Sequence, residues 1–293
     1  MDTWKTIKDL SFKFFGRSLE PFVGYFESIK YDLLRSNLGF SLTEYVYSMF
    51  FILLLLFVVE FPTIVVITAI VLKDAAMAFL LSFTLTTVVL LLVFSLFYMY
   101  PSMASGKRKK SIDATLPFGT TYLATIASSG APPIAMFKIM SQFPEYGELS
   151  VETGKIYRDV EAFGMDLLGA IRKTAARTPS EELKELLWGL DTVLSSGGNV
   201  GDFLHEKSRG FIAEYKRRLE QYSRTLSLLI EVYLTIVLVG SIFFIIMTAL
   251  MSILGGGGDS MGMLFLQFMV IFIALPCASL GFIGLLKAIS PSG

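Results

Sequence analysis

Four long apolar stretches dominate the pattern of hydrophobic and polar positions along the chain. They form two pairs with only a short link inside each pair, and they span Val46–Leu72, Ala75–Tyr100, Leu226–Leu254 and Met263–Leu286. A helix needs about 20 apolar residues to cross the hydrocarbon core of a bilayer, and backbone polar groups cannot stay unpaired in lipid. The pattern therefore predicts an all-α polytopic membrane protein with four transmembrane helices in two hairpins.

Residues 101–225, between the two pairs, show helical periodicity and no strand-like alternation. Thr178–Glu181 reads as a capping box, with Thr178 as the cap and Pro179 at the first helical position. Ser195–Gly198 is typical of a helix end. Between these signals, leucines and valine recur at helical spacing and predict one apolar face, made by Leu183, Leu186, Leu187, Leu190, Val193 and Leu194.

Further helix signals flank this element. One helix is expected to end near Ser128–Gly130, and Pro132-Pro133 to open the next. Another is predicted over Val151–Thr174. A last helix begins near Phe203 and is expected to run unbroken into the third apolar stretch, because Phe211–Arg224 contains neither Gly nor Pro. The central region is thus predicted to be a bundle of five or six helices.

Basic residues predict the orientation of these elements in the membrane. Of the 25 Lys and Arg residues, only Lys73 falls on the side opposite to the others when the chain makes two hairpins. The positive-inside rule then places both termini and the central region in the cytoplasm, in a multi-pass protein of the cell membrane. The predicted domains are N-terminal amphipathic helices (1–45), hairpin 1 (46–100), the cytoplasmic helical bundle (101–225), hairpin 2 (226–287) and a cytoplasmic tail (288–293).

Composition removes several functional classes. Hydrophobic residues make up 54% of the chain. One cysteine, Cys277, and one histidine, His205, cannot supply the ligands of a tetrahedral zinc site. We expect Cys277 to be a small buried hydrophobic residue and His205 to be solvated, and we expect no cofactor. The mixed residues before the first apolar stretch do not read as a secretory signal peptide or as the start of a pilin-like subunit.

Two segments resemble a known family. Ala127–Met136 (ASSGAPPIAM) and Ser195–Leu204 (SSGGNVGDFL) are similar to the two turn motifs of the type II secretion F-domain family, especially its archaeal members. The order of spanning pair, cytoplasmic helical domain and second spanning pair resembles the same family over about residues 35–290.

The resemblance implies a non-enzymatic role. Such proteins form the inner-membrane platform of type II secretion systems, type IV pili and archaella. They are thought to couple a cytoplasmic hexameric secretion ATPase to the insertion of pilin-like subunits. The archaellum platform resembles a tandem duplication, whereas this chain has a single copy, which suggests a pilus-type system completed by a homodimer or a paralogous platform subunit.

Two acidic residues in apolar stretches are candidate functional positions. Glu60 lies near the middle of the first stretch, where an ionisable group is a functional candidate by default. Pro62 beside it removes a backbone donor and predicts a kink, either functional or merely structural. Glu231 lies close to the start of the third stretch and can also be read as reaching the headgroups.

Parts of the sequence also allow other interpretations. Gly256–Asp259 matches the Gly-x-Gly-Asp signature of intramembrane aspartyl proteases, but these enzymes need two close Asp residues, and the nearest candidate is Asp74 in the other link. A small transporter or channel is the main alternative function, suggested only by Glu60–Pro62. We expect the basic run Lys107–Lys110 to hold topology at the lipid bilayer rather than to bind nucleic acid. Without a phosphate-binding loop, the chain is not expected to be its own motor.

Overall fold

The computed structural model of the chain describes residues 20–254, 262, 265 and 268–289, and the regular structure of these residues is entirely helical. The predicted all-α class is therefore confirmed for the described residues. The chain divides into two units, Met1–Arg209 and Gly210–Gly293, each considered by itself below.

Two long helices form the membrane-proximal part of the first unit. Helix α4 (Leu42–Leu72) begins at a capping box in which Ser41 Oγ accepts the backbone N–H of Glu44 and the Glu44 carboxylate accepts that of Ser41. Lys73 ends α4 in the left-handed region, at φ 55°. Asp74 then caps α5 (Ala75–Ser128) by accepting the N–H of Ala76. Two residues therefore suffice to reverse the chain, because each satisfies the helix end next to it.

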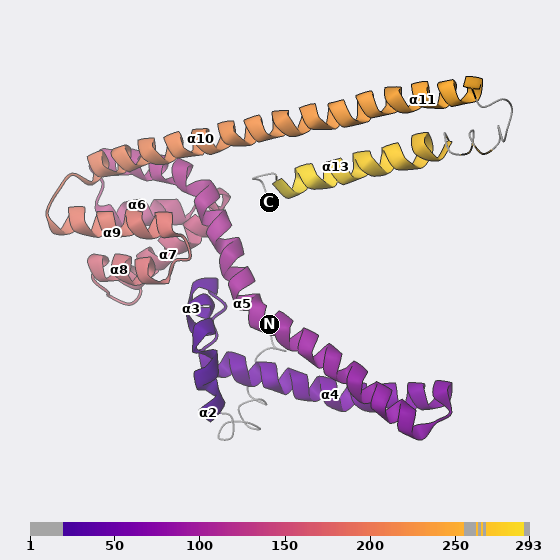
Figure 1. Cartoon of the computed structure of the whole chain (residues 1–293). Coiled ribbons are helices and arrows are strands. Elements are labelled where there is room, and N and C mark those ends of the chain that lie inside the picture. The colour runs from indigo at the N-terminus through magenta and orange to yellow at the C-terminus, as the bar shows by residue number, and fades with distance from the viewer. Residues whose placement is uncertain (1–19, 255–261, 263–264, 266–267, 290–293) are drawn as a thin grey trace. The chain divides into compact units, whose positions relative to one another are not determined.

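Helix α4 packs beside the N-terminal half of α5 (Figure 1). The Thr68 and Ser82 hydroxyls lie 2.7 Å apart near the reversal. At the far end, the Tyr45 hydroxyl donates to the carbonyl of Phe97 over 2.7 Å. The later residue of α4, Thr68, meets the earlier residue of α5, Ser82, and the earlier Tyr45 meets the later Phe97. The two helices are therefore antiparallel.

Helix α5 continues through Pro101 and across the predicted domain boundary at residue 100 to its end at Ser128. Short helices gather around its C-terminal half (Figure 1). These are α6 (Pro133–Ser141), η2 (Pro144–Tyr146), α7 (Glu148–Glu161), α8 (Leu167–Arg177) and α9 (Glu181–Ser195). They bury a common apolar core with α5 and the first turns of α10, which includes Ile112, Leu116, Met136, Phe137, Leu149, Ile156, Ile171, Leu186, Leu190 and Leu204.

A short N-terminal layer precedes α4. It consists of α2 (Glu20–Val23), the 3-10 turn η1 (Gly24–Phe26) and α3 (Glu27–Ser36). Helix α3 packs on α5 and buries Ile29 and Leu33. It ends at Asn37, whose φ of 57° is left-handed. The described part of the N-terminal segment is therefore helical and lies against α5.

Several local predictions are confirmed. Helix α5 ends at Ser128, and α6 opens at Pro133. Helix α9 ends at Ser195, and its predicted apolar face is buried at Leu183, Leu186, Leu187 and Leu190, with Val193 and Leu194 half-buried.

Two local predictions are wrong. Ser180, not Thr178, caps α9, because Thr178 is already the C-terminal cap of α8 and its N–H bonds the Thr174 carbonyl. The helix predicted over Val151–Thr174 is two helices, α7 and α8. Gly164 breaks them apart with a φ of 64°, and Asp166 starts α8 as its cap.

The second unit contains the remaining apolar helices. Helix α10 (Val200–Leu234) begins in the first unit and continues without a break, as predicted, through a π-helical segment η3 (Thr235–Val239) into α11 (Gly240–Leu254). A second π-helical segment, η4 (Val270–Ala274), leads into α13 (Leu275–Ile289). The ring of Tyr233 stacks on that of Phe282, 4.3 Å between centroids, which joins α10 to α13 within this unit.

Three helices are long and apolar enough to cross a membrane, among the residues that the structure describes. They are Leu42–Leu72, the apolar part of Ala75–Ser128, and the continuous helix Val200–Leu250. A shorter apolar helix covers Val270–Gly284. The count of four spans therefore stays a prediction. The prediction that Cys277 is buried is wrong, because its side chain lies on the exposed surface of α13; a residue within an apolar run faces outward when the surrounding medium is itself apolar.

Candidate functional site

The two segments that carry the family resemblance meet in the first unit. Ser128, at the end of α5, places its hydroxyl 3.1 Å from Nε2 of His205 on α10. Two turns earlier on α5 and one turn later on α10, the hydroxyls of Thr121 and Ser208 lie 2.7 Å apart. We call Ser128, Asn199, Gly201 and His205 the motif junction. His205 is exposed, as expected, but it also takes part in this contact.

The small residues of the second segment have identifiable tasks at the motif junction. A Cβ atom on Gly201 would lie 3.0 Å from the Ser128 hydroxyl, so glycine permits the close approach of α5 and α10. Asn199 Oδ1 accepts the backbone N–H of Asp202, which makes Asn199 the N-terminal cap of α10. The junction thus fixes where α10 begins and how it leaves α5.

A buried ion cluster holds α3, α5 and α7 together. The guanidinium of Arg108 on α5 donates from Nε to Glu148 over 2.8 Å, from Nη2 to Glu152, and from Nη1 to the backbone carbonyl of Arg35. Lys155 adds a 2.8 Å bond to Glu152. Because the Glu152 and Arg108 side chains are only 3% and 9% exposed, each depends on the other for neutralisation. The cluster locks the end of α3 and the start of α7 onto α5.

Sequence reasoning missed the role of Arg108. It lies inside the basic run Lys107–Lys110, which we expected to face lipid, whereas the structure buries this one member. A signal was present. Glu148 and Glu152 are one helical turn apart, and two like charges at that spacing repel unless a cation lies between them.

A charged cavity of about 190 Å³ lies beside this cluster. Four cationic side chains and two carboxylates line it, together with the turn that follows α3: Lys155, Arg158, Lys173 and Arg177; Glu152 and Asp159; Asn37, Gly39 and Phe40. Lys173 Nζ lies 2.6 Å from Asp159, whereas the nearest Arg158 nitrogen is 4.0 Å from it. The cavity therefore carries a formal excess of positive charge.

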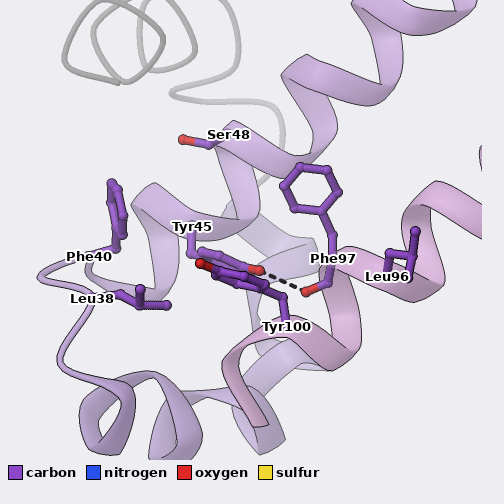
Figure 2. Close-up of a pocket in the computed structure, with 7 residues that line it drawn as sticks. All are labelled: Leu38, Phe40, Tyr45, Ser48, Leu96, Phe97 and Tyr100. Carbon is purple, nitrogen blue, oxygen red and sulfur yellow. Dashed lines mark hydrogen bonds between the residues drawn. The ribbon is translucent and has the colours of Figure 1, made fainter. Parts of the chain in front are cut away.

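An apolar cavity of about 410 Å³ lies where α4 and α5 meet the same turn (Figure 2). It is lined by Leu38, Phe40, Tyr45, Ser48, Leu96, Phe97 and Tyr100. Tyr45 is held by its bond to the Phe97 carbonyl, which Figure 2 shows as a dashed line. Phe40 lines both cavities.

The acidic candidates in the apolar stretches are not brought together with either cavity. Glu60 on α4 is half-buried, and its Oε2 atom is buried without a hydrogen-bond partner. Glu231 on α10 is exposed. Helix α4 continues through Pro62. Asp259, the acid of the Gly-x-Gly-Asp signature, lies outside the described residues.

Electrostatic shifts in the bundle do not suggest proton-transfer chemistry. Burial raises the pKa of Tyr146, with Glu145 and Tyr122 adding to the rise. A hydrogen bond and the charge of Lys184 lower the pKa of Glu181. Both shifts favour the ordinary neutral-pH form of each group. Among the residues that the structure describes, no three His, Cys, Asp or Glu side chains are arranged to hold a metal ion.

Comparison with known proteins identifies one family. Residues 120–248 match the sequence model of the family described as "Type II secretion system (T2SS), protein F". This range contains both segments of the motif junction and the continuous helix that starts at Val200. No solved structure matches the chain.

The similar curated proteins come from methanogens. An uncharacterized protein of Methanocaldococcus jannaschii is 25% identical over 202 residues, which make up 66% of this chain and 33% of that protein. Flagella accessory protein J of the same organism is 32% identical over 125 residues, 41% of this chain and 22% of that protein. The protein of that name from Methanococcus voltae is 26% identical over 145 residues, 49% of this chain and 26% of that protein.

The chain thus spans about a third or less of the length of each of these relatives. The family expected from the two motif segments is confirmed. Residues 120–248 of this chain form a region similar to the type II secretion system protein F family.

Proposed function

We propose that the chain is a non-enzymatic platform in the cell membrane for a machine that builds pilus-like filaments. The match of residues 120–248 to the family model of type II secretion system protein F supports this role, as does similarity to two proteins named flagella accessory protein J. The machine would be of the secretion, type IV pilus or archaellum type. The chain would supply no catalytic group of its own.

The proposed topology has four spans in two hairpins. The antiparallel packing of α4 on α5 supports the first hairpin. The basic residues support placing residues 101–225 and both termini in the cytoplasm, since only Lys73 would face outward. The domain boundaries predicted from the sequence, with 101–225 as the cytoplasmic bundle, are retained in this proposal.

The proposed partners follow from the same family. A cytoplasmic hexameric secretion ATPase would supply energy, and pilin-like subunits would be the cargo that leaves the bilayer. We also propose that the chain works together with a second copy of itself or with a paralogous platform subunit.

The observation that carries the mechanism is the continuity of α10. The motif junction fixes its first turns, and the helix then runs without a break from Val200 to Leu250, into an apolar segment long enough to span a bilayer. The segment Phe211–Arg224 of this helix contains neither glycine nor proline, so it has no residue at which a hinge would absorb displacement along the helix axis. A push on the bundle by the ATPase would therefore reach the membrane through α10.

Deletion of the gene tests this function. The platform role predicts that cells lose filaments while subunits are still cleaved to their mature size and accumulate in the membrane, and that the wild-type gene restores assembly. Filaments at normal number in the deletion strain would refute it. Uncleaved subunits would instead support the protease reading of Gly256–Asp259.

Glu60 favours one alternative, a small transporter or channel, because its Oε2 atom is buried in an apolar stretch without a partner. Solute or ion flux in liposomes holding the purified chain, lost on Glu60→Gln, would support the transporter.

A further inference from the structure

The charged cavity and the apolar cavity are two parts of one amphipathic site. The turn between α3 and α4 separates them and contributes to both. Asn37 and Gly39 line the charged cavity, Leu38 lines the apolar one, and Phe40 lines both. The turn has a fixed shape, because Asn37 and Gly39 both adopt left-handed φ angles, 57° and 73°.

The site lies at the expected level of the membrane surface. Helix α4 begins at Leu42, and its apolar stretch starts one turn later, at Val46. Tyrosines mark the same level on both helices of the pair, namely Tyr45 and Tyr47 on α4 and Tyr98 and Tyr100 on α5. Tyrosine is enriched where hydrocarbon meets headgroups. The apolar cavity is lined by residues of the apolar pair α4 and α5, whereas the charged cavity is lined mainly by residues of α7 and α8.

The charged cavity holds positive charge that its own carboxylates do not neutralise. Glu152 is already neutralised by Arg108 and Lys155, and Asp159 is bonded by Lys173. Arg158 is held only at 4.0 Å from Asp159, with a side chain 60% exposed. Arg177 has no carboxylate partner among the described residues, and its side chain is exposed. Two guanidinium groups are thus available to a phosphate, which arginine binds with paired N–H groups.

We propose that the two cavities together bind one anionic phospholipid, with its phosphate headgroup held by Arg158, Lys173 and Arg177 and an acyl chain in the cavity between Leu38, Leu96 and Tyr100. A cavity of about 410 Å³ lies within the size range of ligand sites, about 300–1,000 Å³. An acyl chain gains free energy with each buried CH₂ group. The bound lipid would fill the space between the first spanning pair and the helical bundle. This site does not depend on the platform role.

Lipid binding to the purified full-length chain in an uncharged detergent tests the proposal, with native mass spectrometry as the readout. The probes are dioleoyl phosphatidylglycerol, dioleoyl phosphatidylcholine and glycerol 3-phosphate. We expect saturable binding of phosphatidylglycerol, binding of phosphatidylcholine weaker by about tenfold, and no binding of glycerol 3-phosphate at the same concentrations. Equal binding of the two lipids would overturn the proposal, and so would displacement of phosphatidylglycerol by equimolar glycerol 3-phosphate.

Each half of the site is tested by one variant and one matched control. Arg158→Gln with Arg177→Gln should weaken phosphatidylglycerol binding by at least about tenfold, whereas Lys207→Gln with Arg209→Gln, which removes the same charge elsewhere on the bundle, should leave it unchanged. Leu96→Trp should occlude the apolar cavity and abolish binding. Its control is Leu92→Trp, one turn away, where the native leucine is similarly exposed. Unaltered affinity in both test variants would contradict the proposed site.

Discussion

The hydroxyl of Ser128 lies 3.1 Å from Nε2 of His205, although the two residues are 77 positions apart. This contact joins the last turn of α5 to the second turn of α10. It unites the two segments whose sequence resembles the turn motifs of the family. The start of the continuous helix that begins at Val200 is therefore fixed to the bundle at the motif junction.

Asn199 should contribute to this fixation as a helix cap. Replacing Asn199 with Ala removes the acceptor of the Asp202 N–H and should lower the free energy of unfolding by about 1 kcal/mol. Asn199→Asp keeps an acceptor and should retain most of that stability. Urea denaturation of the full chain in detergent, followed by circular dichroism, measures both. Equal stability of Asn199→Ala and the wild type would contradict the capping role.

Glu152 should matter more to stability than any surface acid. Glu152→Ala leaves the Arg108 guanidinium buried and short of a carboxylate, and it should cost about 3 kcal/mol. Glu185→Ala is the matched control. Its partner Lys207 is 2.7 Å away, but the Glu185 side chain is 73% exposed, so its loss should cost less than about 1 kcal/mol. The same denaturation experiment compares them, and similar losses for both variants would rule out a special role for the buried cluster.

The sequence predicts the helical elements well because their signals are local. Periodic leucines predict the buried face of α9, and Ser128–Gly130 predicts the end of α5. The exact start of a helix is harder to predict where two possible capping residues lie within a few positions of each other. Thr178 and Ser180 are both good caps, and only the exact length of α8 decides between them.

The candidate site is harder to predict, since its residues come from distant elements. Arg108 meets Glu148, Glu152 and the carbonyl of Arg35 only after α3 and α7 have docked on α5. Neither cavity has a signature in the sequence, because the turn at Asn37–Phe40 joins residues from positions 33 to 177. Local periodicity carries no information on such pairings.

Glu60 should act in filament assembly through its ionisable group. Glu60→Gln has nearly the same shape, so it should insert into the membrane in normal amounts while lowering the number of filaments. Glu231→Gln is the comparison, and it should be nearly neutral because Glu231 is exposed. Filament counts by electron microscopy, normalised to membrane-bound protein, give the result. Normal assembly by Glu60→Gln would remove Glu60 from the mechanism.

The proposed topology can be read from single cysteines introduced into a Cys277→Ser chain. Ala75→Cys at the start of α5, next to the link between α4 and α5, should react with a membrane-impermeant maleimide in intact cells. Ser129→Cys and Ser196→Cys, both at exposed positions of the bundle, should react only after lysis. Reaction of either bundle cysteine in intact cells would invert the assignment of sides.

The central claim is that displacement passes through an unbroken α10. Arg217 and Arg218 lie on its exposed surface, with side chains 69% and 54% exposed. Replacing both with Gly or both with Ala removes the same charges, but each Gly weakens the helix by about 1 kcal/mol relative to Ala.

Filament number per cell, compared between these two double variants at equal membrane content, is the most direct measurement. We predict that Arg217→Ala with Arg218→Ala assembles filaments nearly as the wild type does, and that Arg217→Gly with Arg218→Gly loses most of them. Equal filament numbers in the two strains would contradict transmission through this helix.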